Sequence, residues 1–103
     1  MNAKKAPIIP KKTITEEEKI ILKKVGERLK HLRKEAGYTS YEYFAYENNI
    51  SRPQYGKYEA GANIQLNTLI RILKSLNISL EDFLRGYDGV LSGKDSVSFA
   101  MEQ

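Results

Sequence analysis

The sequence predicts an all-α domain of five helices, flanked by two terminal segments that have no helical pattern. Apolar residues recur at steps of three and four from Leu22 to Leu76, the spacing of one face of an α-helix. Glycines at positions 37, 61 and 86 are placed to end helices, because glycine readily adopts the left-handed cap conformation. Residues that cap helix starts precede four of the segments: Thr15, Ser40, Ser51 and Ser79.

Composition limits the class of protein. The 103 residues are 41% hydrophobic and 29% charged, which fits one soluble domain. No apolar run approaches the roughly 18 residues of a membrane span, and Pro7 and Pro10 interrupt the only apolar stretch near the start. We therefore expect no secretory signal, no membrane association and a cytoplasmic, nucleoid-associated protein.

Few residues are available for catalysis or metal binding. There is no cysteine and one histidine, His31, so thiolate sites and paired imidazole ligands are excluded. The sequence has no glycine-rich phosphate loop and no serine-histidine pair. We expect no enzyme activity, no metal and no cofactor.

Positive charge is concentrated near the N-terminus. The formal net charge is +4, and residues 1–15 carry four lysines and no acid. This positive charge favours an anionic partner, although charge alone does not establish one. We expect a basic flexible arm over 1–14, a helical domain over 15–85 and a flexible tail over 86–103.

The first helix is predicted over 16–36. Thr15 and Glu18 have the spacing of a capping box, in which each side chain satisfies the other's backbone amide. Gly37 is placed to end the helix. One apolar stripe runs along it: Leu22, Val25, Leu29, Leu32 and Ala36.

Two short helices follow, over about 41–47 and 52–60. Ser40 and Ser51 are placed as their caps, and Pro53 lies in a first turn, where proline sacrifices no hydrogen bond. A fourth helix is predicted from Leu66, Leu69, Ile70, Leu73 and Leu76. Ser79 and Asp82 then have capping-box spacing for a fifth helix through Leu84.

The helix over 52–60 separates two kinds of side chain. At about 100° per residue, Tyr55 and Tyr58 share one flank that can pack inward. The opposite face is predicted to hold Arg52, Pro53, Gly56 and Lys57. Arginine and lysine can donate hydrogen bonds to guanine in the major groove of DNA, and we expect Gly56 to let the helix lie close to the groove.

The order of these motifs resembles the lambda-repressor-like, XRE-type helix-turn-helix domains. Three stretches carry the resemblance: VGERLKHLRKEAG, TSYEYFAYENNISRPQYGKYEAG and LNTLIRILKSLNISLEDFL. They extend from Val25 to Leu84, about 60 of the 103 residues. The resemblance implies a five-helix lambda-repressor-like fold in which the helix over 52–60 enters the major groove.

The resemblance also implies roles for individual residues. Positions that match the family's base-reading residues are Arg52, Pro53 and Lys57, and those expected at the DNA backbone are Ser40, Tyr41, Ser51, Gln54 and Asn63. Arg33 and Glu59 match a pair that orients the recognition helix. Pro53 cannot donate a hydrogen bond, Tyr41 replaces the usual glutamine, and Ala60 has no polar group at a position that often contacts phosphate.

The resemblance implies a transcriptional regulator, a repressor that acts by occupying double-stranded DNA as a homodimer. One alternative is an antitoxin-like or adaptor module that binds a protein partner through the tail and through Tyr43 and Tyr46, on the outer side of the second helix. Another is sequence-blind nucleic-acid binding by the N-terminal lysines. The sequence does not identify the surface through which the homodimer would form; the fifth helix and the tail are candidates.

Overall fold

The computed structural model describes residues 13–85, which form five helices and no strand. The expected tail over 86–103, and all but the last two residues of the expected arm over 1–14, lie outside the described residues. The predicted all-α class is confirmed for the part that is described. No helix between residues 13 and 85 has both the length and the apolarity needed to cross a membrane.

α1 (Glu16–Glu35) is the longest of the five helices; it begins at the predicted residue and ends one residue before the predicted end. The Thr15 hydroxyl accepts a hydrogen bond from the Glu18 amide at 3.1 Å, while the Glu18 carboxylate accepts one from the Thr15 amide at 2.9 Å. Gly37 adopts a φ of 99°, which is the left-handed conformation that ends a helix. Ala36 is exposed at the cap rather than part of the buried stripe.

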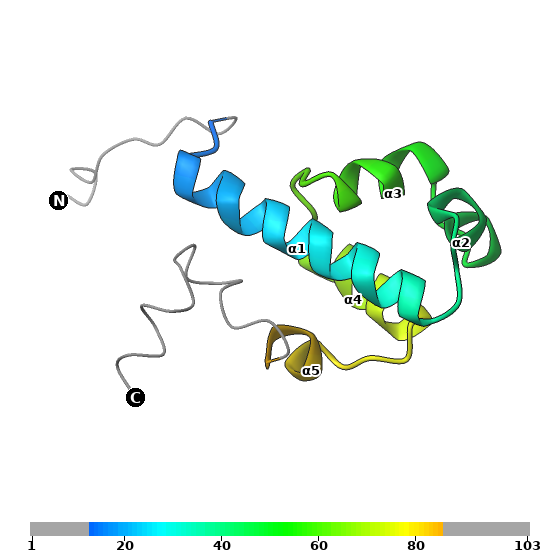
Figure 1. Ribbon diagram of the computed structural model, residues 1–103. Coiled ribbons are helices and arrows are strands. Elements are labelled where there is room, and N and C mark those ends of the chain that lie inside the picture. The colour runs from blue at the N-terminus through cyan, green and yellow to red at the C-terminus, as the bar shows by residue number, and fades with distance from the viewer. Residues whose placement is uncertain (1–12, 86–103) are drawn as a thin grey trace, which may run out of the picture.

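Four shorter helices complete the domain: α2 (Tyr41–Glu47), α3 (Arg52–Glu59), α4 (Leu66–Ser75) and α5 (Leu80–Arg85). In Figure 1, α3 lies above α1 and α2 lies near its C-terminal end, while α4 runs behind α1 and α5 lies below it. Side chains from all five helices meet in one core, whose fully buried members include Leu29, Phe44, Tyr55, Ile72 and Phe83. α1 therefore connects the α2–α3 pair to the rest of the domain.

The buried face of α4 differs from the predicted one. Ile72 is fully buried, whereas Leu66 and Ile70 are 60% and 37% exposed. The helix turns Leu69, Ile72 and Leu73 toward the core, and that stripe advances by three and four residues. Ile70 follows Leu69 by about 100° and so lies at the edge of the stripe.

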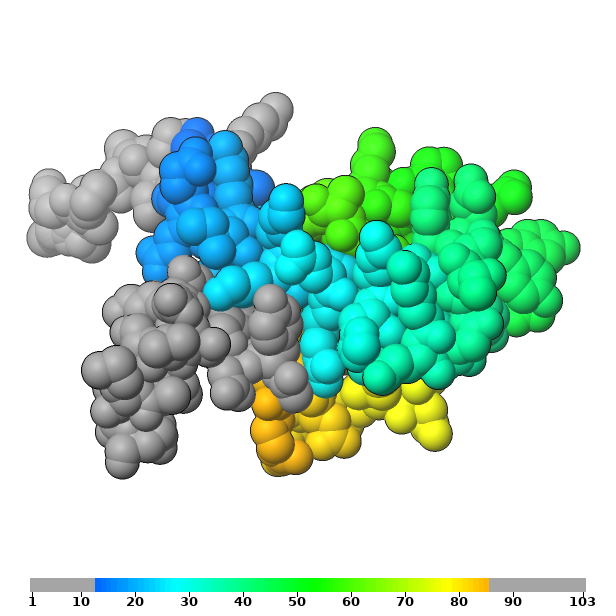
Figure 2. Space-filling model, in the orientation of Figure 1, coloured from blue at the N-terminus to red at the C-terminus, as the bar shows by residue number. Residues whose placement is uncertain are grey.

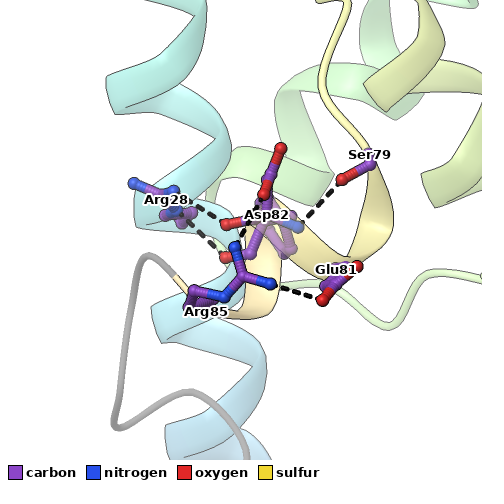
Figure 3. A network of polar contacts seen from close by, with 6 residues as sticks. Arg28, Ser79, Glu81, Asp82 and Arg85 are labelled. Atoms are coloured by element: carbon purple, nitrogen blue, oxygen red, sulfur yellow. Dashed lines mark hydrogen bonds and ion pairs between the residues drawn. The ribbon is translucent and has the colours of Figure 1, made fainter.

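An arginine from α1 holds α5 in place. Arg28 donates from Nε to the Phe83 carbonyl at 3.3 Å, and its guanidinium carbon lies 5.8 Å from the centre of the Phe83 ring. Ser79 caps α5 by accepting from the Asp82 amide at 3.0 Å, and Arg85 bonds to Asp82 and Glu81 (Figure 3). The last helix is thereby anchored to the middle of α1.

α1 and α3 approach each other closely at Gly26, which is buried in the middle of α1. A Cβ atom on Gly26 would lie 2.5 Å from the Tyr58 carbonyl oxygen and 2.6 Å from that of Glu59. Neither backbone oxygen can move without shifting the end of α3. The absence of a side chain at position 26 therefore sets the distance between the two helices.

We predict that Gly26→Ala destabilises the domain. In an open helix the change would add about 1 kcal/mol of stability, but the clash with two carbonyls should instead remove about 1–3 kcal/mol. Urea unfolding followed by circular dichroism measures the difference. Glu27→Ala, on the exposed side of the same turn, is the matched control and should change stability by less than about 0.5 kcal/mol. A Gly26→Ala protein more stable than wild type would contradict the close approach.

Candidate nucleic-acid interface

A tight turn sets α3 beside α2. Asn49 adopts a φ of 62°, which asparagine tolerates better than most residues, and the Ile50 amide donates to the Ala45 carbonyl at 2.8 Å. Ser51 then begins α3, its hydroxyl accepting from the Gln54 amide at 3.4 Å. This turn fixes where the first residue of α3 stands relative to the end of α2.

α3 buries one tyrosine in the core and exposes polar side chains to solvent. Arg52, Gln54 and Lys57 are exposed, as is Pro53, while Tyr55 is completely buried. The green atoms of α2 and α3 form one continuous surface at the upper right of Figure 2. The first turn of α3 contains no acidic residue. The exposed part of the helix therefore offers hydrogen-bond donors and positive charge.

Gly56 has a packing role that its place on the outward face of α3 did not predict. A Cβ atom there would lie 2.7 Å from Cε1 of Tyr41, so the Tyr41 ring covers the position. The same ring lies 6.4 Å from that of Tyr55, centre to centre. Gly56 is therefore only half-exposed, and its lack of a side chain makes room for an aromatic ring of α2.

The other polar residues expected at a DNA backbone lie at the start of α2 and after α3. Ser40 is half-buried and caps α2, accepting from the Tyr43 amide at 3.1 Å. Tyr41 is 37% exposed, so part of its ring lies free at the surface next to α3. Asn63 is exposed in the connection between α3 and α4. These positions offer further polar groups, and their contact with DNA remains a prediction.

The structure joins Arg33 and Glu59 in a buried ion pair. Arg33 donates from Nε and Nη2 to the two carboxylate oxygens at 2.7 and 3.0 Å, and their side chains are 3% and 8% exposed. Nη1 of Arg33 donates to the Tyr38 carbonyl at 2.7 Å. One guanidinium therefore connects α1, the end of α3 and the segment that leads into α2.

The ion pair also affects the pKa values of Arg33 and of the neighbouring Tyr55. The hydrogen bond to Glu59 raises the pKa of Arg33, which keeps the guanidinium charged although burial acts in the opposite sense. Burial, followed by the neighbouring Glu59, raises the pKa of Tyr55 far above its ordinary value. The phenol thus stays neutral, and charge at this contact is confined to one cation and one anion.

Three contacts could not be identified from the helix patterns. They are the approach of α1 to α3 at Gly26, the Tyr41 ring over Gly56, and the Arg52 guanidinium carbon 5.9 Å from the centre of the Tyr46 ring. A glycine inside a helical pattern costs about 1 kcal/mol relative to alanine, so Gly26 stands out in the sequence, but helical spacing does not identify the partner helix. The two aromatic contacts join different helices and have no comparable signal in sequence spacing.

The fold and this surface define a helix-turn-helix domain of the DNA-binding kind. A helix-turn-helix family model matches residues 29–83, which is more than half of the chain. The protein belongs to this family of lambda-repressor-like, XRE-type domains, as the sequence motifs predicted. Searches of curated proteins and of solved structures give no significant match.

We predict that breaking the buried ion pair strongly destabilises the domain. Glu59→Gln leaves the Arg33 guanidinium buried without its counter-charge, and loss of one partner of a buried pair costs about 3–5 kcal/mol. Urea unfolding measures the loss. Arg85→Met, which removes an exposed cation paired with Glu81 and Asp82, is the control and should cost no more than about 1 kcal/mol.

The double variant Arg33→Met, Glu59→Leu provides the second arm. Because it removes both charges together, its loss of stability should be smaller than the sum of the losses of Arg33→Met and Glu59→Leu, each measured alone. Strictly additive losses, or a Glu59→Gln loss no larger than that of Arg85→Met, would show that the pair does not hold the helices.

Proposed function

We propose that this protein is a sequence-specific regulator of transcription that inserts α3 into the major groove of double-stranded DNA. The observation that carries the proposal is the combination of exposed Arg52 and Lys57 on α3 with a buried ion pair at the opposite end of that helix. A rigidly held helix with outward donors meets the geometric requirement for reading base edges.

Each exposed side chain has a proposed role. Arg52 and Lys57 donate to guanine O6 and N7, and Pro53 makes apolar contact only, because it has no donor. Backbone phosphates are contacted by Ser40, Tyr41, Ser51, Gln54 and Asn63. These phosphate contacts position the protein on the duplex, whereas the base contacts select the sequence.

The biological form we propose is a homodimer that represses by occupying its site in the cytoplasm. One recognition helix reads only a few base pairs, so two copies on half-sites roughly 34 Å apart supply a longer sequence. A protein-interaction module is the alternative. It receives less support, because the Tyr43 hydroxyl donates to Glu47 at 2.7 Å and Tyr46 lies beside Arg52, which gives both rings partners within the domain.

Selection of duplexes from a random pool at about 150 mM salt tests the proposal. We expect wild type to enrich a motif of two half-sites, and Arg52→Glu to lose it, since a carboxylate would meet guanine acceptors and phosphates. Arg71→Glu, the same charge change at an exposed position of α4, is the control and should enrich the same motif with lower affinity.

Two outcomes would overturn the proposed function. If both charge reversals weaken all sequences alike, binding is sequence-blind and driven by net charge. If wild type enriches no sequence, the helix-turn-helix acts as a scaffold for a protein partner.

A further inference from the structure

Tyrosines on and beside α2 differ in what their side chains contact within residues 13–85. The hydroxyls of Tyr38 and Tyr43 both donate to the Glu47 carboxylate, at 2.9 and 2.7 Å, and this raises the pKa of each phenol. Tyr46 is 70% exposed. Its recorded contact within residues 13–85 is with the guanidinium of Arg52.

The contact lies at the junction of the two helices. Tyr46 is in the last turn of α2, and Arg52 is the first residue of α3. The guanidinium carbon lies 5.9 Å from the ring centre, within the roughly 6 Å over which a cation is attracted to an aromatic face. The tight turn at Asn49 brings the two side chains together, although five residues separate them.

Few other interactions restrain the Arg52 side chain among residues 13–85. Among residues 13–85 it forms no ion pair, and it stands at the N-terminus of α3, whose positive dipole end does not attract a cation. Two surface hollows adjoin it. Tyr46 lines one, and Glu42 lines the other, together with Tyr41 and Pro53.

We propose that Tyr46 is a positioning residue that determines how well Arg52 discriminates bases. The ring holds the guanidinium at the start of α3 and so limits its rotamers. A long side chain that is already ordered loses less entropy when it binds. The inference rests on the proposed function, since it concerns the base contact that Arg52 makes.

The test compares two substitutions of one ring. Tyr46→Leu removes the aromatic face and keeps a helix-forming residue, and we expect it to weaken binding to the selected duplex about two- to fivefold, the range for an exposed cation–π contact. Binding to unrelated duplexes should not change. Tyr46→Phe retains the face and should bind like wild type. Tyr43→Leu removes another exposed ring of α2 that does not contact Arg52, and is the matched control.

A double-mutant cycle separates positioning from direct contact with DNA. In an Arg52→Ala background, Tyr46→Leu should cause no further loss, because the side chain it positions is absent. If Tyr46→Phe weakens binding as much as Tyr46→Leu does, or if the loss persists without Arg52, the tyrosine contacts DNA itself and the inference is wrong.

Nuclear magnetic resonance of the protein without DNA gives an independent readout. The ring should shift the Cδ protons of Arg52 in wild type and in Tyr46→Phe, and the shift should vanish in Tyr46→Leu. An unchanged spectrum in Tyr46→Leu would overturn the inference. If wild type selects no duplex, the proposed function fails, while this spectrum still decides whether the ring holds the guanidinium.

Discussion

The arrangement of this domain depends on one buried ion pair. Arg33 reaches from α1 to both oxygens of Glu59 at the end of α3, and to the Tyr38 carbonyl before α2. Burying two charges is costly unless geometry and hydrogen bonding compensate, and here each guanidinium nitrogen has an acceptor. Because the pair tolerates few alternative geometries, it specifies one orientation of α3 on α1. Gly26 adds a steric condition, since α1 can approach the end of α3 only where no side chain intervenes.

The packing of α3 in the core determines which of its side chains are exposed. Tyr55 fills the core from the middle of α3, with its ring 5.1 Å from that of Phe44. A short helix that buries this side chain must turn its other flank toward solvent, and that flank carries Arg52 and Lys57. The Tyr41 ring over Gly56 joins the start of α2 to the same helix. The two helices therefore present their polar groups as one rigid unit, which is the property that base recognition requires.

Most of the fold could be predicted because its signals are local. Capping residues and glycines lie within a few positions of the helix ends they determine, so the predicted helix limits differ from the observed ones by about one residue, within the usual uncertainty. The contacts of Gly26 and Gly56 could not be predicted in the same way, because their partners belong to other helices. Gly56 was expected to face a groove, and only packing shows that Tyr41 covers it. The burial of Ile72 in place of Ile70 likewise depends on how α4 meets the core.

The central claim is that α3 reads bases in the major groove, and methylation interference on the selected duplex tests it most directly. Dimethyl sulfate methylates guanine N7 in the major groove and adenine N3 in the minor groove. The account predicts that N7 methylation blocks binding at guanines in two half-sites about one helical turn apart, and that one guanine per half-site loses this effect in Arg52→Ala. Interference confined to adenine N3, or a guanine pattern unchanged in Arg52→Ala, would contradict it.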